Sequence, residues 1–230
     1  MNIAAIQPFS LSDYPGKLAA IAFCRGCNFQ CPYCHNPELL PTDPPIPNQP
    51  IQIWEFLEAR QGKLDAVVIS GGEPTLQADA LIPLAQKIKN MGFQIKLDTN
   101  GTHPSVLSQL LKQELLDYIA MDIKGPPNKY PQITAVDCDW NAISESIAII
   151  MHSDIDHEFR TTIANPLLTP QDIETCAKTI QGAAHYILQP YKRLDPPTPE
   201  SLNLSTPTKQ ELETSRQLAA PWVAECSIRN

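Results

Sequence analysis

Four cysteines occur within eleven residues of the chain, at positions 24, 27, 31 and 34. Ordinary packing gives no reason for such a density, so the cluster indicates metal chemistry. If all four thiolates bound one metal, the site would be closed, as in a structural zinc site or an electron-transfer cluster. If only Cys27, Cys31 and Cys34 bound it, one coordination position would stay open for a reaction.

The composition describes the setting of this cluster. The chain has 230 residues, of which 43% are hydrophobic, enough for one sizeable core. A formal net charge of -8, with no lysine or arginine run, argues against a general grip on nucleic acid or anionic lipid. No leader pattern opens the chain, and nowhere do about eighteen apolar residues run together. Seven cysteines, an odd number, favour a reducing cytoplasmic compartment over a disulfide framework.

Short apolar runs alternate with stretches of helical spacing along the chain. This alternation predicts parallel strands joined by right-handed crossovers, hence a barrel or a doubly wound sheet. Thr169 before Pro170 indicates a helix start, and Gly92 and Gly182 indicate helix ends. The predicted strands cover residues 18–23, 65–70, 93–97, 117–123, 158–163 and 185–189, and the predicted helices cover 51–60, 76–91, 104–115, 141–151 and 170–180.

One domain over residues 1–230 is expected, with a core at about 10–192 and a closing unit at about 205–230. In that unit the capping box Thr208-x-x-Glu211 opens a helix, and a strand follows it at about 222–228.

Polar residues gather where the predicted strands end. The cysteine cluster follows the first strand, Gly71-Gly72-Glu73-Pro74 the second, Asp98 lies at the end of the third, and Asp122-Ile123-Lys124 at the end of the fourth. Parallel α/β folds bring the carboxyl ends of their strands to one edge, where their active sites lie. The sequence therefore predicts one site at this edge.

Three motifs together resemble the radical S-adenosylmethionine (SAM) enzymes. They are FCRGCNFQCPYCHNP at 23–37, GGEP at 71–74 and SLSDYPGK at 10–17. More narrowly, they resemble the activating enzymes of glycyl-radical proteins, with the nearest likeness to the anaerobic ribonucleoside-triphosphate reductase activating type. The resemblance covers about residues 10–191. It implies a partial (βα)6 TIM-like barrel of parallel strands, with an extra C-terminal helix and strand.

The resemblance implies the metal ligands. Cys27, Cys31 and Cys34 would hold three irons of a [4Fe-4S] cluster, which leaves the fourth iron to the amino and carboxylate groups of SAM. Cys24 would then be a spectator, because a fourth thiolate would displace SAM. The alternative, a four-cysteine zinc site, leaves GGEP and the Asp-x-Lys motif at 122–124 unexplained.

The resemblance also implies cofactor contacts around the cysteines. Tyr33 would lie near the adenine, and His35 is a further expected contact next to the last cysteine. Gly71 and Gly72 would let the backbone approach the methionine amino group, while Glu73 orients their loop.

Charged residues at the later strand ends complete the implied site. Asp98 and Asp122 would lie beside the SAM carboxylate with a monovalent cation between them, since two acids would otherwise repel it. Lys124 would contact SAM or its carboxylate, and Arg160 would reach its ribose or methionine part. The chain departs from the family at Lys192, where a histidine often follows Pro-Tyr.

The activity implied is that of an oxidoreductase. It would cleave SAM reductively and abstract the α-hydrogen of a glycine in a partner protein, with anaerobic ribonucleotide reductase as the expected partner. The alternative is a small-molecule radical SAM enzyme such as a 7-carboxy-7-deazaguanine synthase, which tends to place a metal-binding threonine near the position where this chain has CHNP, 34–37. Because no further cysteine-rich stretch is present, electrons should come from a flavodoxin or ferredoxin. Neither nucleic acid nor a membrane is an expected partner.

Overall fold

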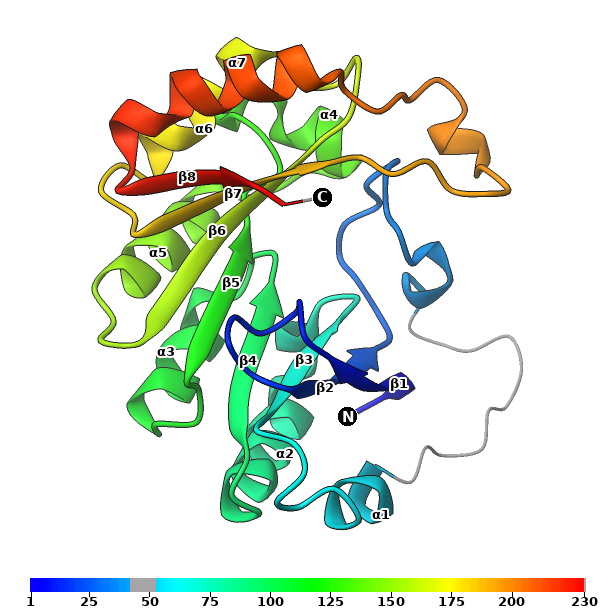
Figure 1. Cartoon of the computed structure of the whole chain (residues 1–230), viewed down its shortest axis with the longest axis vertical. Helices are drawn as coiled ribbons and strands as arrows, with labels where there is room; N and C mark the ends of the chain where they lie inside the picture. Colours follow the sequence, from blue (N-terminus) through cyan, green and yellow to red (C-terminus); the bar gives the residue numbers. More distant parts are fainter. Residues whose placement is uncertain (42–52, 230) are drawn as a thin grey trace.

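The computed structural model describes residues 1–41 and 53–229. Its centre is one sheet of eight strands in the order β1 to β8, so that each strand lies beside its neighbour in sequence (Figure 1). Strands β2 to β8 are parallel, whereas β1 is antiparallel to β2. Within the described ranges, no helix has the length and apolar character needed to cross a membrane. The strands are β1 Ile3–Ser10, β2 Ala19–Cys24, β3 Ala66–Gly71, β4 Gln94–Thr99, β5 Tyr118–Asp122, β6 Asp156–Ile163, β7 His185–Pro190 and β8 Glu225–Ile228.

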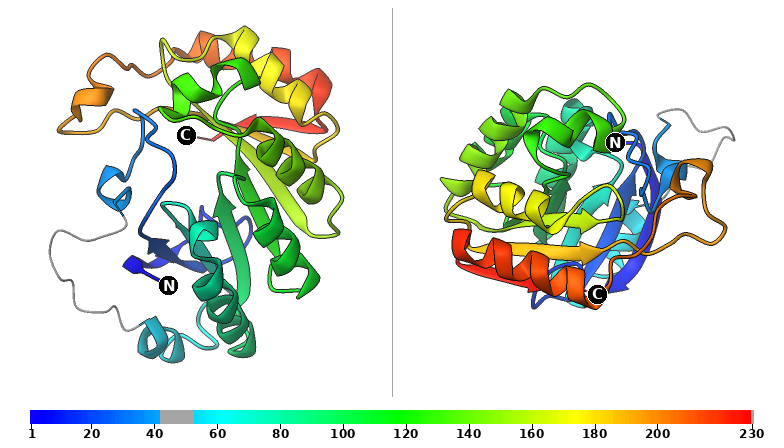
Figure 2. Two further views of the ribbon diagram at one scale, coloured as in Figure 1. Left: turned by 180° about the vertical axis from the view of Figure 1, so that it is seen from behind. Right: turned by 90° about the horizontal axis from the view of Figure 1, so that it is seen from above.

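Helices cover the outer side of the curved sheet. Figure 2 shows the strands as an open arc with the long helices outside it and loops on the inner side. The α-helices are α1 Ile53–Glu58, α2 Ala78–Asn90, α3 Pro104–Lys112, α4 Tyr130–Thr134, α5 Trp140–Met151, α6 Pro170–Thr179 and α7 Lys209–Ala219. Short 3-10 turns lie at η1 Pro37–Leu39, η2 Pro74–Gln77, η3 Pro127–Lys129, η4 Pro199–Ser201 and η5 Ala220–Trp222.

The predicted partial barrel with a closing helix and strand is confirmed. All six predicted strands and five predicted helices are present with shifted ends, and the closing unit appears as α7 and β8. Residues 51 and 52 of the first predicted helix lie outside the described residues. Strand β1 was not predicted, because its buried and exposed positions do not alternate. It carries Pro8, which an edge strand tolerates because one side of its backbone has no partner strand.

The predicted helix ends are confirmed by their caps. In both α6 and α7 the cap threonine, Thr169 or Thr208, accepts a hydrogen bond from the backbone N–H three residues on. Asp172 and Glu211 accept the reciprocal bonds from the cap N–H groups, which completes two capping boxes. Gly182 follows α6 with φ +89°, a left-handed conformation that glycine adopts at little cost.

The inner side of the sheet divides into an apolar and a polar part. On β6, Glu158, Arg160 and Thr162 alternate with Phe159 and other residues that pack in the helix-covered core. The polar set therefore points into the barrel, toward the carboxyl end of the strands. The amino end is filled by a small apolar cluster of Tyr14, Ala19, Ile21, Ala66, Val68 and Tyr118.

Candidate functional site

A cavity of about 250 Å³ opens at the carboxyl end of the parallel strands. The cysteine loop after β2 forms one wall, and the ends of β3 to β7 form the other. Eleven of the twelve predicted site residues line this cavity, and Glu73 is the exception. The fold thus brings together residues that are up to 133 positions apart in the sequence, from Cys27 to Arg160.

The cysteine loop contributes three free thiols to the cavity, those of Cys27, Cys31 and Cys34. Cys24 is not among the lining residues; it ends β2 opposite Gly71 of β3 and has no exposed surface. In the described part of the chain, no three cysteine, histidine or acidic side chains converge as a single metal ion would require. The donor set is therefore three thiols spread along one wall, without a fourth.

Hydrogen bonds attach this loop to the strand ends beneath it. The Gln30 N–H donates to the Thr134 carbonyl at 2.8 Å. Asn28 donates to the Thr102 hydroxyl at 2.9 Å and accepts from the Asn100 side chain at 2.8 Å. The loop contains no regular strand or helix between Cys24 and Pro37. These three hydrogen bonds therefore fix its position relative to the end of α4 and to the residues that follow β4.

Burial sets the protonation of the thiols. It raises the pKa of Cys27 to about 11, and it also raises the pKa of Cys31. Lys124 acts in the opposite direction on both pKa values, because its charge favours a nearby thiolate. The thiols of Cys27 and Cys31 therefore keep their protons at neutral pH unless a metal displaces them.

Gly71 and Gly72 permit a backbone approach that differs from the predicted one. A Cβ on Gly71 would lie 2.4 Å from the Cys24 nitrogen, and a Cβ on Gly72 would lie 2.1 Å from the Gly26 carbonyl oxygen. The Gly72 N–H donates to the Cys24 carbonyl at 2.9 Å, and the Glu73 N–H donates to the Gly26 carbonyl at 2.7 Å. The two glycines also line the cavity. Their closest neighbours, however, are backbone atoms of Cys24 and Gly26, so their main structural effect is to let β3 and the loop after it pack against the start of the cysteine loop.

We therefore expect Gly72→Ala to disturb the cysteine loop. Because the added methyl group would overlap backbone rather than a flexible side chain, its cost should be about 1–3 kcal/mol of unfolding free energy. Iron content after anaerobic reconstitution should fall together with SAM affinity. Gly62→Ala is the control, since it has nothing within 4 Å and only the strain of φ +71°. Normal iron content in Gly72→Ala would show that the loop can move away.

Glu73 is fully buried and faces away from the cavity. Its carboxylate accepts hydrogen bonds from the Thr75 N–H at 3.0 Å, the Thr99 hydroxyl at 2.9 Å and the Asn100 N–H at 2.6 Å. Burial raises its pKa, although these bonds lower it. Glu73 thus orients the loops after β3 and β4, and the structure gives it no surface for direct cofactor contact.

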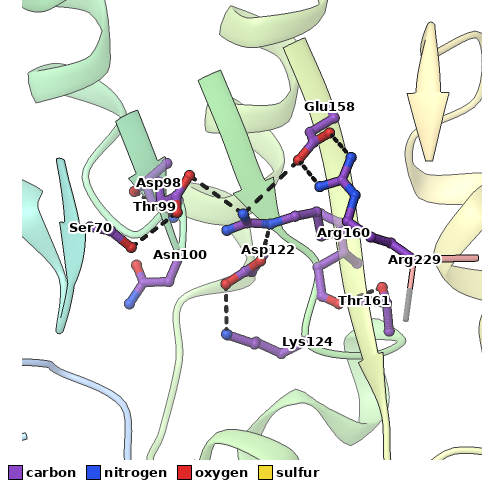
Figure 3. A network of polar contacts seen from close by, with 12 residues as sticks. Ser70, Asp98, Thr99, Asn100, Asp122, Lys124, Glu158, Arg160, Thr161 and Arg229 are labelled. Atoms are coloured by element: carbon purple, nitrogen blue, oxygen red, sulfur yellow. Dashed lines mark hydrogen bonds and ion pairs between the residues drawn. The ribbon is translucent and has the colours of Figure 1, made fainter. Parts of the chain in front are cut away.

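In the same cavity as the thiols, charged side chains form a chain across β4, β5 and β6. Figure 3 shows this chain of contacts. Arg160 lies between the two acids, with Nη1 at 3.4 Å from Asp98 and Nε at 2.9 Å from Asp122. Lys124 pairs with the other oxygen of Asp122 at 3.0 Å. Ser70 donates a hydrogen bond to Asp98 at 3.0 Å.

This chain of charges alters the argument for a monovalent cation. Burial alone would raise the pKa of both acids, but Arg160 and Lys96 hold the pKa of Asp98 below its usual value. Arg160 and Lys124 likewise lower the pKa of Asp122 to about 2. Both carboxylates are therefore ionised beside protein cations. A monovalent cation was predicted because Asp98 and Asp122 would otherwise repel the SAM carboxylate. Arg160, Lys96 and Lys124 already neutralise these two acids, so the site does not require a separate cation.

A second layer of charges, not predicted from the sequence, lies inside the barrel. Lys96 is fully buried, 3.1 Å from Asp98 and 3.9 Å from Glu158. Arg229 donates to both oxygens of Glu158, at 2.9 and 2.7 Å. The available signal was a lysine within the apolar run at 93–97, but the second acid with which it forms an ion pair, Glu158, is 62 residues away in the sequence.

Three residues of the loops above the cavity have defined positions. Tyr33 is buried beside the cysteines, and its hydroxyl has no hydrogen-bond partner among the described residues. The ring of His35 stacks on Tyr191 with 6.3 Å between centroids. Burial lowers the pKa of His35, and the nearby charge of Lys192 lowers it further. Lys192 stands where the family often has a histidine after Pro-Tyr. Its side chain is exposed, so it does not occupy an enclosed position as a ring-stacked histidine would.

These residues fit a three-ligand iron-sulfur cluster with SAM beside it. The three thiols on one wall supply sulfur ligands and leave one coordination position without a protein donor. The opposite wall offers both signs of charge, in Asp98, Asp122, Lys124 and Arg160. SAM carries an amino group, a carboxylate and a sulfonium, so a wall with both signs matches it better than a wall of one sign would.

Comparisons with known proteins agree with this geometry. Residues 21–181 match the family model of the radical SAM superfamily. A Methanocaldococcus jannaschii protein, provisionally named a glycyl-radical enzyme activating enzyme, is 36% identical over 99% of this chain and 95% of its own length. A 7-carboxy-7-deazaguanine synthase of Thermococcus kodakarensis is 24% identical over 74% of this chain and 73% of its own length. A crystallised domain of a pyruvate-formate lyase-activating enzyme from Bacteroides vulgatus matches at 16% identity with a TM-score of 0.59, over 72% of this chain and 99% of that domain, which shows the fold alone.

Proposed function

The chain belongs to the radical SAM superfamily and, within it, to the glycyl-radical activating enzymes, and we propose that its substrate is a glycine in a separate partner protein. The family uses a [4Fe-4S] cluster and SAM. With Cys27, Cys31 and Cys34 as its ligands, a bound cluster would supply the one electron needed for reductive cleavage of SAM at its S–C5′ bond, and the adenosyl fragment would take the glycine α-hydrogen. One observation carries the proposal: three free thiols line a charged cavity in a chain that matches an activating enzyme along nearly its whole length.

In this proposal Cys27, Cys31 and Cys34 hold the cluster. Their shared place in one cavity wall supports the assignment, as does the exclusion of Cys24 from that wall. Lys124 and Arg160 bind the carboxylate end of SAM, and Tyr33 packs beside the adenine. Gly71 and Gly72 keep the loop after β3 close enough to the thiols for SAM to bridge both walls.

The acids of the cavity have a binding role and need not move a proton. The α-hydrogen leaves as an atom, with its electron, so no base has to receive H⁺. Asp98 and Asp122 suit this role because their pKa values are lowered and each has a cation within 3.4 Å. They can fix the amino group of SAM while remaining ionised throughout the reaction.

Anaerobic ribonucleotide reductase is the partner we propose to test first, because the three sequence motifs most resemble those of its activating proteins. Beyond the motif at 24–34, the cysteines of the described residues are Cys138 in the loop before α5, Cys176 in α6 and Cys226 in β8, which are too dispersed to offer a second cluster. A flavodoxin or ferredoxin therefore supplies the electron in this proposal. A reducing cytoplasmic location is part of it.

The test uses reduced, reconstituted enzyme with SAM and the intact partner. We expect a doublet electron-paramagnetic-resonance signal on the partner together with formation of 5′-deoxyadenosine, because the remaining α-hydrogen couples to the unpaired spin. Deuterium in the α-positions of glycine should appear in 5′-deoxyadenosine and collapse the doublet.

Two controls separate this function from its alternative. A partner with the target glycine replaced by alanine should give neither the doublet nor the labelled product. If the enzyme instead consumes a free pterin with rapid SAM cleavage, and leaves every candidate partner free of radical, it is a small-molecule enzyme of the synthase kind.

A further inference from the structure

A second cavity of about 240 Å³ adjoins the first on the inner side of the sheet. Four residues, His35, Arg160, Thr162 and Gln189, line both cavities and so mark the boundary between them. The second cavity continues down to Lys96 and Arg229 and out to Asp13 and Lys192. None of the metal-binding thiols lines it, so it is separate from the proposed cluster site.

Most of the charges in this cavity are already paired. Lys96 lies beside Asp98 and donates to the Asp13 carbonyl, while Arg229 binds Glu158 through both of its terminal nitrogens. Arg160 is shared between Asp98 and Asp122. Lys192 has no ion pair with any described residue, but it lies at the exposed rim. A cavity whose inner cations are neutralised in this way is poorly suited to a multiply charged anion such as a phosphate.

Uncharged polar groups at the boundary are available instead. Thr162 and Gln189 are directly paired across β6 and β7, so their side chains lie side by side on the inner face. Both are half-buried, and across residues 1–41 and 53–229 neither side chain has a hydrogen-bond partner. The amide of Gln189 offers a donor and an acceptor in one plane, and the hydroxyl of Thr162 offers one more of each.

We propose that Gln189 and Thr162 bind the main-chain amide groups that flank the target glycine, so that the second cavity receives the glycine-bearing segment of the partner. Resting on the proposed function, this inference follows from the chemistry of glycine itself. Because glycine has no side chain, the enzyme can recognise it only through the peptide groups on either side of it. A primary amide matches a peptide group because each carries one carbonyl acceptor and N–H donors in a plane. The boundary position places the glycine Cα next to the SAM cavity.

The test measures the KM for the intact partner and the maximal rate of glycyl-radical formation separately. Gln189→Met keeps the length of the side chain and removes its hydrogen bonds, and Thr162→Val does the same for the hydroxyl. We expect each to raise the KM about tenfold, the effect of losing one or two hydrogen bonds. SAM affinity and thermal unfolding should stay near those of the wild type, and Thr162→Ser should restore the KM. Gln181→Met, in the exposed turn after α6, is the matched control.

A second readout asks whether the peptide backbone is what Gln189 recognises. The probe is a capped peptide of the partner's glycine segment, used as a competitor, and its analogue with an ester in place of the amide after the glycine. The wild type should bind the amide about tenfold better than the ester, while Gln189→Met should bind both equally.

The outcomes keep the two hypotheses apart. If the wild type makes a glycyl radical but Gln189→Met and Thr162→Val keep its KM, the assignment of these residues is wrong and the proposed function stands. The assignment is also wrong if Gln189→Met prefers the amide peptide over the ester peptide as strongly as the wild type does. It is wrong as well if neither protein distinguishes the two peptides. If the wild type makes no radical on any partner, the proposed function itself fails.

Discussion

Replacing Cys31 with alanine is expected to abolish both the iron-sulfur cluster and SAM cleavage. Cys31 is the middle one of three thiols that line the cavity, and two thiolates cannot hold three irons of a cluster in place. Wild-type protein reconstituted anaerobically should contain about four irons per chain and show a broad charge-transfer absorption. The variant should show neither, and its production of 5′-deoxyadenosine should fall to background.

Cys24→Ala is the matched control, since it removes a thiol seven residues away in the same motif. Burial raises the pKa of Cys24 to about 12, and the thiol lies at the end of β2 outside the cavity wall. Its loss should leave a small void that costs about 1 kcal/mol of unfolding free energy while iron content stays normal. If Cys24→Ala loses iron and SAM cleavage as completely as Cys31→Ala, all four cysteines are ligands, and the open-coordination argument is wrong.

The sequence indicated which residues meet at the cavity, because that prediction depends only on where the parallel strands end. Asp98 ends a strand in which apolar residues precede it, and Gly71 follows another such run. Once the strands are parallel, their carboxyl ends must meet, whatever the exact register. The edge strand β1 lacks any such pattern, because its burial depends on the pairing with β2 rather than on a hydrophobic face.

The inner charge network was not predictable, because it depends on register. Ala120 of β5 pairs with Asp98 of β4 on one side and with Glu158 of β6 on the other. Its methyl group is small, so side chains from β4 and β6 can meet above it, and Lys96 reaches toward Glu158 across it. A single-residue slip would turn one of these charges to the opposite face of the sheet.

The glycines show a different limit of sequence reasoning. A Gly-Gly pair indicates that something approaches the backbone closely, but it does not identify what approaches. At Gly72 the close neighbour is the Gly26 carbonyl of the same chain. The pair is therefore needed to build the site, whatever it also contributes to binding SAM.

The same inner network leads to the largest expected effect on stability, that of Lys96→Met. This change keeps most of the buried volume but removes the ammonium group beside Asp98 and Glu158, both nearly or fully enclosed. Breaking a buried ion pair from one side typically costs about 3–5 kcal/mol, since the remaining charge stays buried. Because Arg160 still faces Asp98 and Arg229 still binds Glu158, we expect the lower end of that range, about 3 kcal/mol, in anaerobic urea unfolding.

Lys178→Met provides the comparison, because Lys178 pairs with Glu174 at 2.8 Å on the exposed side of α6 and should cost about 1 kcal/mol or less. Lys96 also donates to the Asp13 carbonyl, so its loss should release the loop between β1 and β2 that borders the second cavity. Faster amide hydrogen exchange at residues 11–17 in Lys96→Met, but not in Lys178→Met, would be the sign of that release. Equal stability losses in the two variants, with no change in exchange, would mean that Arg160 and Arg229 neutralise the interior without Lys96. In that case Lys96 would contribute to the polar lining of the second cavity and not to the stability of the fold.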